Sequence, residues 1–122
     1  MIYSIQSRKK VFWLLRISLT IAALYHLTGL FYKVNDATVL RHAVFVTLDS
    51  FCVYGFFKRP RCFVFCFAAF TLHQYLNHGT YLIDWWISKQ EIHWISFFVL
   101  AVLPIGLVGL IEEYSQPFSS KQ

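Results

Sequence analysis

Charged residues are scarce in this 122-residue sequence, at 14%, whereas soluble domains carry about 25%. Apolar residues make up 57% of the chain and aromatic residues 20%. A soluble domain of this size needs polar side chains over its whole surface, so the composition excludes one. A lipid-facing surface removes the conflict, and we expect a single integral membrane domain over residues 1–122.

Cysteine is also rare, and the catalytic motifs of common enzymes are missing. The three cysteines, Cys52, Cys62 and Cys66, are odd in number and lie in apolar runs, which excludes a disulfide framework. Cys62 and Cys66 share a helical face, but their spacing is not the C-x-x-C of dithiol enzymes. No H-E-x-x-H or H-x-x-E-H pattern and no nucleophile–base pair is present. The sequence therefore favours a non-catalytic protein and leaves a membrane enzyme that acts on lipids as the alternative.

Four apolar runs have the length of membrane spans, which need roughly 20 residues each. They cover residues 11–32, 39–57, 62–83 and 93–111. The loops between these runs are short enough to make neighbouring helices antiparallel. The first run is too long for a signal peptide and has no small-residue cleavage site, so we expect it to remain. The predicted fold is an all-α, four-helix integral membrane bundle.

The basic residues predict the orientation of this bundle. Seven Lys and Arg residues lie on the side of the two termini and three on the other side, which places both termini in the cytoplasm of a bacterial cell. Trp85, Trp86 and Trp94 gather at the outer boundary, as an aromatic belt in the inner membrane would. Because the net charge of +5 comes from these loops, topology explains it and nucleic-acid binding is not expected.

Asp49 is a carboxylate near the middle of the second predicted span. It lies about 12 Å from the end of that span, and His73 lies about 16 Å from the start of the third. Because these two helices should be antiparallel, we expect Asp49 and His73 to form an intramembrane polar pair. The pair could be a structural hydrogen bond or the centre of a proton- or ion-conducting element.

The third span carries one row of small and polar side chains at spacings of three and four. This polar row comprises Cys62, Cys66, Ala69, His73, Asn77, Thr80 and Asp84. We expect it to face the neighbouring helices, because polar groups in lipid are costly. In the fourth span, Pro104 removes a backbone hydrogen bond and predicts a kink.

Three spans place a histidine at a similar depth, within a slab of roughly 5 Å. These residues are His26, His42 and His78, and Asn77 directly precedes His78. Imidazoles that converge could bind a transition metal or ligate a haem. They could also hydrogen-bond a quinone or a lipid headgroup. Isolated structural or interfacial histidines are the remaining alternative.

The segment "LLRISLTIAALYHLTGLFYKVND" resembles the opening of DoxX-like membrane proteins, which are small four-helix bundles. The residues that carry the likeness are Arg16, Gly29, Leu30, Lys33, Asn35 and Asp36. The chain departs from the common pattern at Asp49, where a Glu nearer the start of the helix would be usual, and in its histidine-rich third span.

The resemblance implies an accessory role. Some DoxX-like proteins are small subunits of quinone-linked oxidoreductases, and others accompany redox or thiol-handling partners. We therefore expect an accessory subunit that contacts membrane lipids and either another membrane protein or further copies of itself. Binding of haem, metal, quinone or lipid through the histidines is the alternative, and conduction through Asp49 and His73 is a further one.

Overall fold

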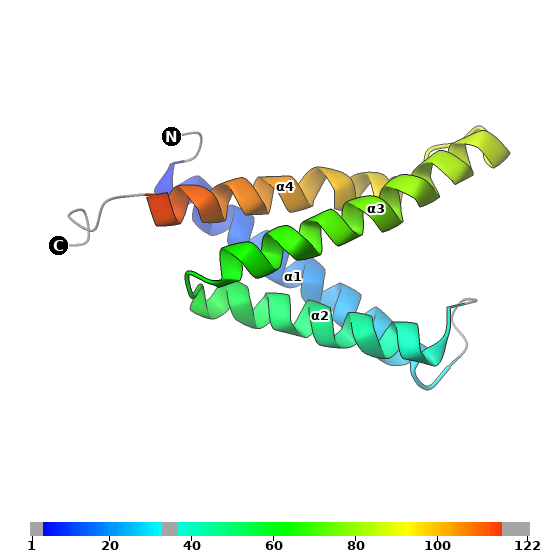
Figure 1. Ribbon diagram of the computed structural model, residues 1–122, viewed down its shortest axis with the longest axis horizontal. Coiled ribbons are helices and arrows are strands. Elements are labelled where there is room, and N and C mark those ends of the chain that lie inside the picture. The colour runs from blue at the N-terminus through cyan, green and yellow to red at the C-terminus, as the bar shows by residue number, and fades with distance from the viewer. Residues whose placement is uncertain (1–3, 33–36, 116–122) are drawn as a thin grey trace. The chain divides into compact units, whose positions relative to one another are not determined.

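The computed structural model describes residues 4–32 and 37–115, which form four α-helices and no strand (Figure 1). The helices are α1 (Ile5–Gly29), α2 (Val39–Lys58), α3 (Phe63–Lys89) and α4 (Trp94–Ser115). This confirms the predicted all-α architecture. By length and composition, α1, α2 and α4 could each cross a membrane. Helix α3 has 27 residues but is less apolar, because it carries the polar row.

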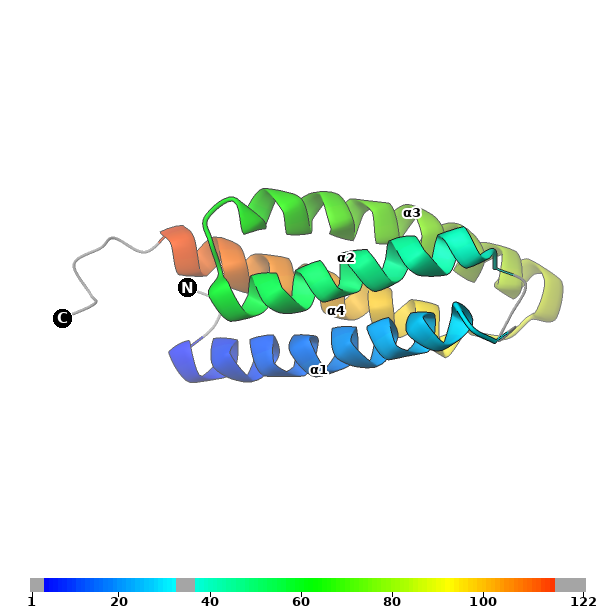
Figure 2. The same ribbon diagram turned by 90° about the horizontal axis from the view of Figure 1, so that it is seen from below.

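The chain divides into two compact units, each containing two consecutive helices. Residues Ile5–Pro60 contain α1 and α2, which lie side by side (Figure 2). The other unit contains α3 and α4, which also pack on each other. Each unit is an antiparallel helical hairpin, as the short joints predicted.

The first hairpin is held by a seam of apolar side chains at spacings of three and four. The buried members are Phe12, Leu15 and Leu19 of α1 and Phe45, Cys52 and Phe56 of α2. The rings of Phe12 and Phe56 lie 5.5 Å apart. Large apolar side chains also cover the outer face of the hairpin, for example Ile21, Leu24 and Phe51. A helix that is apolar on both faces is suited to lipid.

The helix ends differ from the ends of the predicted spans, which marked apolar runs, and they differ least in α2. Helix α2 begins after Thr38, whose side chain accepts a hydrogen bond from the Arg41 amide at 3.2 Å. It ends at Arg59, which has a φ of 47°, followed by Pro60. Helix α1 includes the basic residues before the first predicted span, since Arg and Lys are good helix formers. Helix α3 continues six residues beyond residue 83, because the Trp-rich sequence there favours an interfacial helix over a loop.

In the second hairpin, the buried face of α3 is aromatic and not the polar row. The buried residues are Phe63, Phe67, Phe70, Thr71 and Gln74. Six members of the polar row are exposed, and Asn77 is half-buried. The expectation that this row faces the neighbouring helices was therefore wrong within the hairpin. Phe side chains bury more apolar area than small residues would, and the polar groups bond along their own helix, as Thr80 does to the Leu76 carbonyl at 2.8 Å.

Candidate functional site

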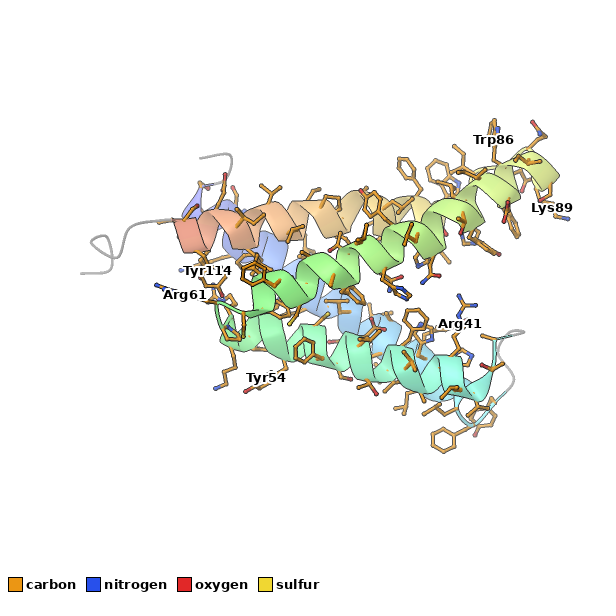
Figure 3. The ribbon with its side chains drawn as sticks, viewed as in Figure 1. Arg41, Tyr54, Arg61, Trp86, Lys89 and Tyr114 are labelled. Carbon is orange, nitrogen blue, oxygen red and sulfur yellow. The ribbon has the colours of Figure 1, made fainter. Side chains whose placement is uncertain are left out.

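A hydrogen-bonded histidine pair joins α1 to α2 near the Gly29–Val39 end of the first hairpin. The Nδ1 atoms of His26 and His42 lie 3.0 Å apart. His42 is 1% exposed and His26 is half-buried. Arg41, next to His42, marks this end of α2 in Figure 3, and Tyr54 lies toward the other end. The structure therefore brings together two of the three histidines that the sequence placed at one depth.

Aromatic rings and one glycine fix the positions of these imidazoles. The ring of Phe45 stacks on His26 at 4.9 Å, and Tyr25 contacts His26 edge-on at 5.2 Å. Gly29 lies directly against His42, since a Cβ at Gly29 would lie 2.5 Å from the His42 ring. Only glycine allows this close approach of helix and imidazole. The pair is thus built into the packing of the hairpin.

The contact between two Nδ1 atoms determines the chemistry of the neutral pair. One ring must donate through Nδ1–H and the other must accept, because a hydrogen bond needs one proton. The donating ring then has an unprotonated Nε2, and the accepting ring has an Nε2–H. The histidine pair therefore combines one acceptor and one donor nitrogen. These roles are exchanged only when the shared proton crosses to the other Nδ1 and, in addition, the ring that receives it loses its Nε2 proton while the ring that gave it gains one at Nε2.

The arrangement fits haem and metal less well. A haem iron with two axial histidines lies between the imidazoles, whereas the Nδ1 atoms here are in direct contact. Within residues 4–32 and 37–115, no group of three or more His, Cys, Asp or Glu side chains could hold a metal ion. Two imidazoles fall short of the usual donor set of a transition metal.

A shallow groove runs along the flank of the first hairpin. Its volume is about 290 Å³, and seven residues line it: Thr20, Ala23, Leu24, Leu27, Val46, Ser50 and Val53. Leu27 is adjacent to His26, and Val46 is one helical turn from His42. The groove is therefore mostly aliphatic, with two hydroxyl groups, and begins close to the histidine pair.

A second polar cluster, His78, His93 and Ser96, links α3 to the start of α4. The Ser96 hydroxyl lies 3.0 Å from Nδ1 of His78 and 2.9 Å from Nδ1 of His93. The Ser96 amide donates to Nδ1 of His93 at 3.3 Å, so this nitrogen carries no proton. If the hydroxyl also donates to His93, it accepts from Nδ1–H of His78. Ser96 is 0% exposed, which makes the cluster a helix cap and not an accessible nucleophile.

The remaining predicted site residues are His73 and Asn77 of α3 and Asp49 of α2. On α3, Nδ2 of Asn77 and Nε2 of His73 are 2.8 Å apart. Asp49 is 3% exposed, and its Oδ2 has no hydrogen-bond partner among the described residues. Asp49 and His73 belong to different hairpins. The Asp49–His73 pair and the addition of His78 and Asn77 to the histidine pair stay predictions.

Sequence reasoning missed the serine cluster because it treated His93 only as a boundary residue. His93 stands directly before an apolar run, and Ser96 follows three positions later. This spacing is a variant of a helix-capping pattern and could have indicated the cluster. Here the imidazole of His93 accepts the amide hydrogen that a Ser or Asp side chain usually accepts.

Comparison with known proteins found no matching family model, no similar curated protein and no similar solved structure. The likeness to DoxX-like proteins therefore rests on the sequence stretch alone. Three of the residues that carry it, Lys33, Asn35 and Asp36, lie outside the described residues.

Proposed function

We propose that this protein binds an amphiphile with a hydrogen-bonding headgroup, of the quinone or lipid class, at the histidine pair. The observation that carries the proposal is the 3.0 Å contact between His26 and His42, with one imidazole buried and the other half-buried. We further propose that the protein resides in a bacterial cytoplasmic membrane with both termini inside. The excess of basic residues on the side of the termini supports this orientation.

The two imidazoles have different roles in this proposal. His26 is half-buried and contacts the headgroup, whereas the buried His42 holds His26 in one orientation and tautomer. A quinone carbonyl accepts a hydrogen bond from a protonated ring nitrogen, and a quinol or lipid hydroxyl donates to an unprotonated one. The pair can satisfy either headgroup, because the tautomer in which His26 accepts at Nδ1 presents Nε2–H and the tautomer in which His26 donates from Nδ1 presents an unprotonated Nε2.

The groove supplies the site for the apolar tail. Its aliphatic walls match an isoprenoid or acyl chain, and its volume of about 290 Å³ limits it to part of such a chain. Binding pockets for small molecules are usually apolar with a few placed polar groups. The combination of groove and histidine pair has this composition.

The experiment measures binding of decylubiquinone to the full-length protein in detergent micelles by equilibrium dialysis, with a monoacylglycerol as the second ligand. His26→Gln should weaken binding about tenfold, the worth of one or two hydrogen bonds. His42→Gln should weaken it less, since it acts through His26. His73→Gln, an exposed histidine of the other hairpin, is the matched control and should bind as the wild type does.

Equal binding by wild type, His26→Gln and His73→Gln would show that the ligand merely partitions into the micelle. Binding of the monoacylglycerol but not of decylubiquinone would assign the site to lipids and remove the quinone version.

A second candidate function is that of an accessory subunit that docks through α3. It is favoured by one observation, the exposure of the polar row along a helix of an apolar protein. Polar side chains are costly in lipid, so another protein chain is expected to cover them. Co-purification in mild detergent should yield a stoichiometric partner that Asn77→Leu removes. Leu72→Ala, at an exposed apolar position of the same helix, should leave the partner bound.

A further inference from the structure

The end of the first hairpin opposite the histidine pair carries three arginines near Phe12. Arg59 lies over the Phe12 ring at 5.7 Å, and Arg8 lies one helical turn before Phe12. Nε of Arg16 donates to the Phe12 carbonyl at 3.3 Å, and its guanidinium lies 4.5 Å from the Phe57 ring. We call Arg8, Arg16 and Arg59 the arginine end. These contacts bring positive charge from both helices to one place.

Arg8 is the unusual member, because it is buried and one of its donor atoms is unused. It is 6% exposed, and its Nη1 atom has no hydrogen-bond partner among the described residues. A guanidinium stays charged at every physiological pH, so it cannot avoid the cost of burial by losing its proton. Burial of an unpaired charge is strongly unfavourable. An anionic ligand would remove this penalty.

The helix itself adds positive potential at the same point. Arg8 lies in the first turns of α1, followed by Lys9 and Lys10, and the first turn contains no acidic residue. The N-terminus of a helix carries a partial positive charge, which repels these side chains and attracts anions. Asp49 is the single acidic residue among the described residues of this hairpin, and it lies ten positions from Arg59, about 15 Å along α2.

We propose that the arginine end binds the phosphate group of an anionic phospholipid. A planar guanidinium matches a phosphate with two parallel hydrogen bonds, and Arg8 presents an unused donor there. Exposed apolar side chains on α1, Ile5 and Trp13, flank this position, so acyl chains can lie along the helix. The site is at the other end of the hairpin from the histidine pair and does not depend on the proposed function.

The test compares the full-length protein in nanodiscs of phosphatidylcholine alone and of phosphatidylcholine with phosphatidylglycerol. Native mass spectrometry counts the phosphatidylglycerol molecules retained, and thermal unfolding measures their effect. Arg8→Gln should lower the affinity for phosphatidylglycerol about tenfold, as loss of a charge-assisted bond predicts. Lys9→Gln removes the same charge from the same turn at an exposed position and should change the affinity little.

A second readout separates ligand binding from a structural role of Arg8. In phosphatidylcholine alone, Arg8→Gln should unfold at the same temperature as the wild type or higher, because it removes an unpaired buried charge. Phosphatidylglycerol should raise the unfolding temperature of the wild type and of Lys9→Gln but not that of Arg8→Gln. If Arg8→Gln does not fold, Arg59→Gln should show the same loss of phosphatidylglycerol in a folded protein.

Three results would overturn the proposal. Equal loss of phosphatidylglycerol in Arg8→Gln and Lys9→Gln would show that lipid retention depends only on the net charge of the protein. A lower unfolding temperature of Arg8→Gln in phosphatidylcholine would show that Arg8 stabilises the fold through a partner within the protein. If millimolar inorganic phosphate reproduced the stabilisation in phosphatidylcholine nanodiscs, the ligand would be the free anion and not the lipid.

Discussion

The Tyr75 hydroxyl donates a hydrogen bond of 2.6 Å to the backbone carbonyl of Leu100. Leu100 lies four residues before Pro104, which is inside α4 and has no amide hydrogen. The carbonyl that proline leaves unpaired in α4 is therefore paired by a side chain of α3. This bond links α3 to α4 at the position where α4 lacks one of its own backbone hydrogen bonds.

We expect Tyr75→Phe to destabilise the protein by about 1 kcal/mol, the worth of one hydrogen bond in a membrane protein. In the Pro104→Ala background the cost should be much smaller, because the new amide of residue 104 can pair with Leu100. Unfolding by SDS titration of the wild type, the two single variants and the double variant gives the coupling energy. Tyr54→Phe, at an exposed tyrosine of the other hairpin, controls for loss of a hydroxyl. Equal costs in both backgrounds would contradict the assignment.

Gly29→Ala should destabilise the first hairpin by about 1–3 kcal/mol, as overpacking of a filled interior does. The added methyl group would overlap the buried His42 ring and separate it from His26. Gly79→Ala is the matched control, because a Cβ there meets nothing within 4 Å. It should stabilise α3 by about 0.5–1 kcal/mol through the better helix propensity of alanine. Denaturant titration of both variants measures the difference.

The N–H···N bond of the histidine pair should give a scalar coupling between two imidazole nitrogens in ¹⁵N-histidine-labelled protein. The coupling should disappear in Gly29→Ala and persist in Gly79→Ala. A spectrum of the wild type in which every imidazole nitrogen behaves as an isolated ring would rule out the pair.

Ser96→Ala should cost about 1–3 kcal/mol, because it leaves two half-buried imidazoles without their hydroxyl partner. The ¹⁵N spectrum of the wild type should show His93 protonated at Nε2, since its Nδ1 accepts from the Ser96 amide. Ser115→Ala removes an exposed hydroxyl that bonds only along its own helix and should be neutral within measurement error. Protonation of His93 at Nδ1 would contradict the cap geometry.

Gln90→Gly should stabilise the second hairpin by about 1 kcal/mol, since Gln90 has a φ of 55° and non-glycine residues are strained there. Thermal unfolding measures the gain. Gln74→Gly, inside α3, should instead be destabilising, which separates the backbone effect from loss of the side chain.

The helices and their hairpin connections could be predicted because apolar runs of span length leave few alternatives. The Lys58–Arg61 turn, for instance, combines basic residues with Pro60, which cannot continue a helix. The orientation of α3 could not be predicted by the same reasoning. Its polar row and its phenylalanine face are both regular at helical spacing, and the choice between them depends on how much apolar area each buries.

The candidate site was predictable only in part. Depth along the chain correctly grouped His26 with His42, because a short joint and a fixed rise per residue align the ends of two antiparallel helices. Side-chain pairing could not be deduced in this way. Pro104 leaves the Leu100 carbonyl without a backbone donor, and the donor that replaces it could have come from any neighbouring helix. The burial of Arg8 depends on packing at the start of α1.

Helix α3 has a geometric consequence for any bilayer that holds it. Its 27 residues extend about 40 Å, whereas the hydrocarbon layer is about 30 Å thick. Either the helix tilts or its last turns, which carry Trp86 and Lys89 (Figure 3), reach past the fatty-acid chains into the glycerol and headgroup region. An epitope tag inserted after Lys89 would then be accessible to antibodies from one face of a sealed vesicle, and that face would identify the side on which the loop lies.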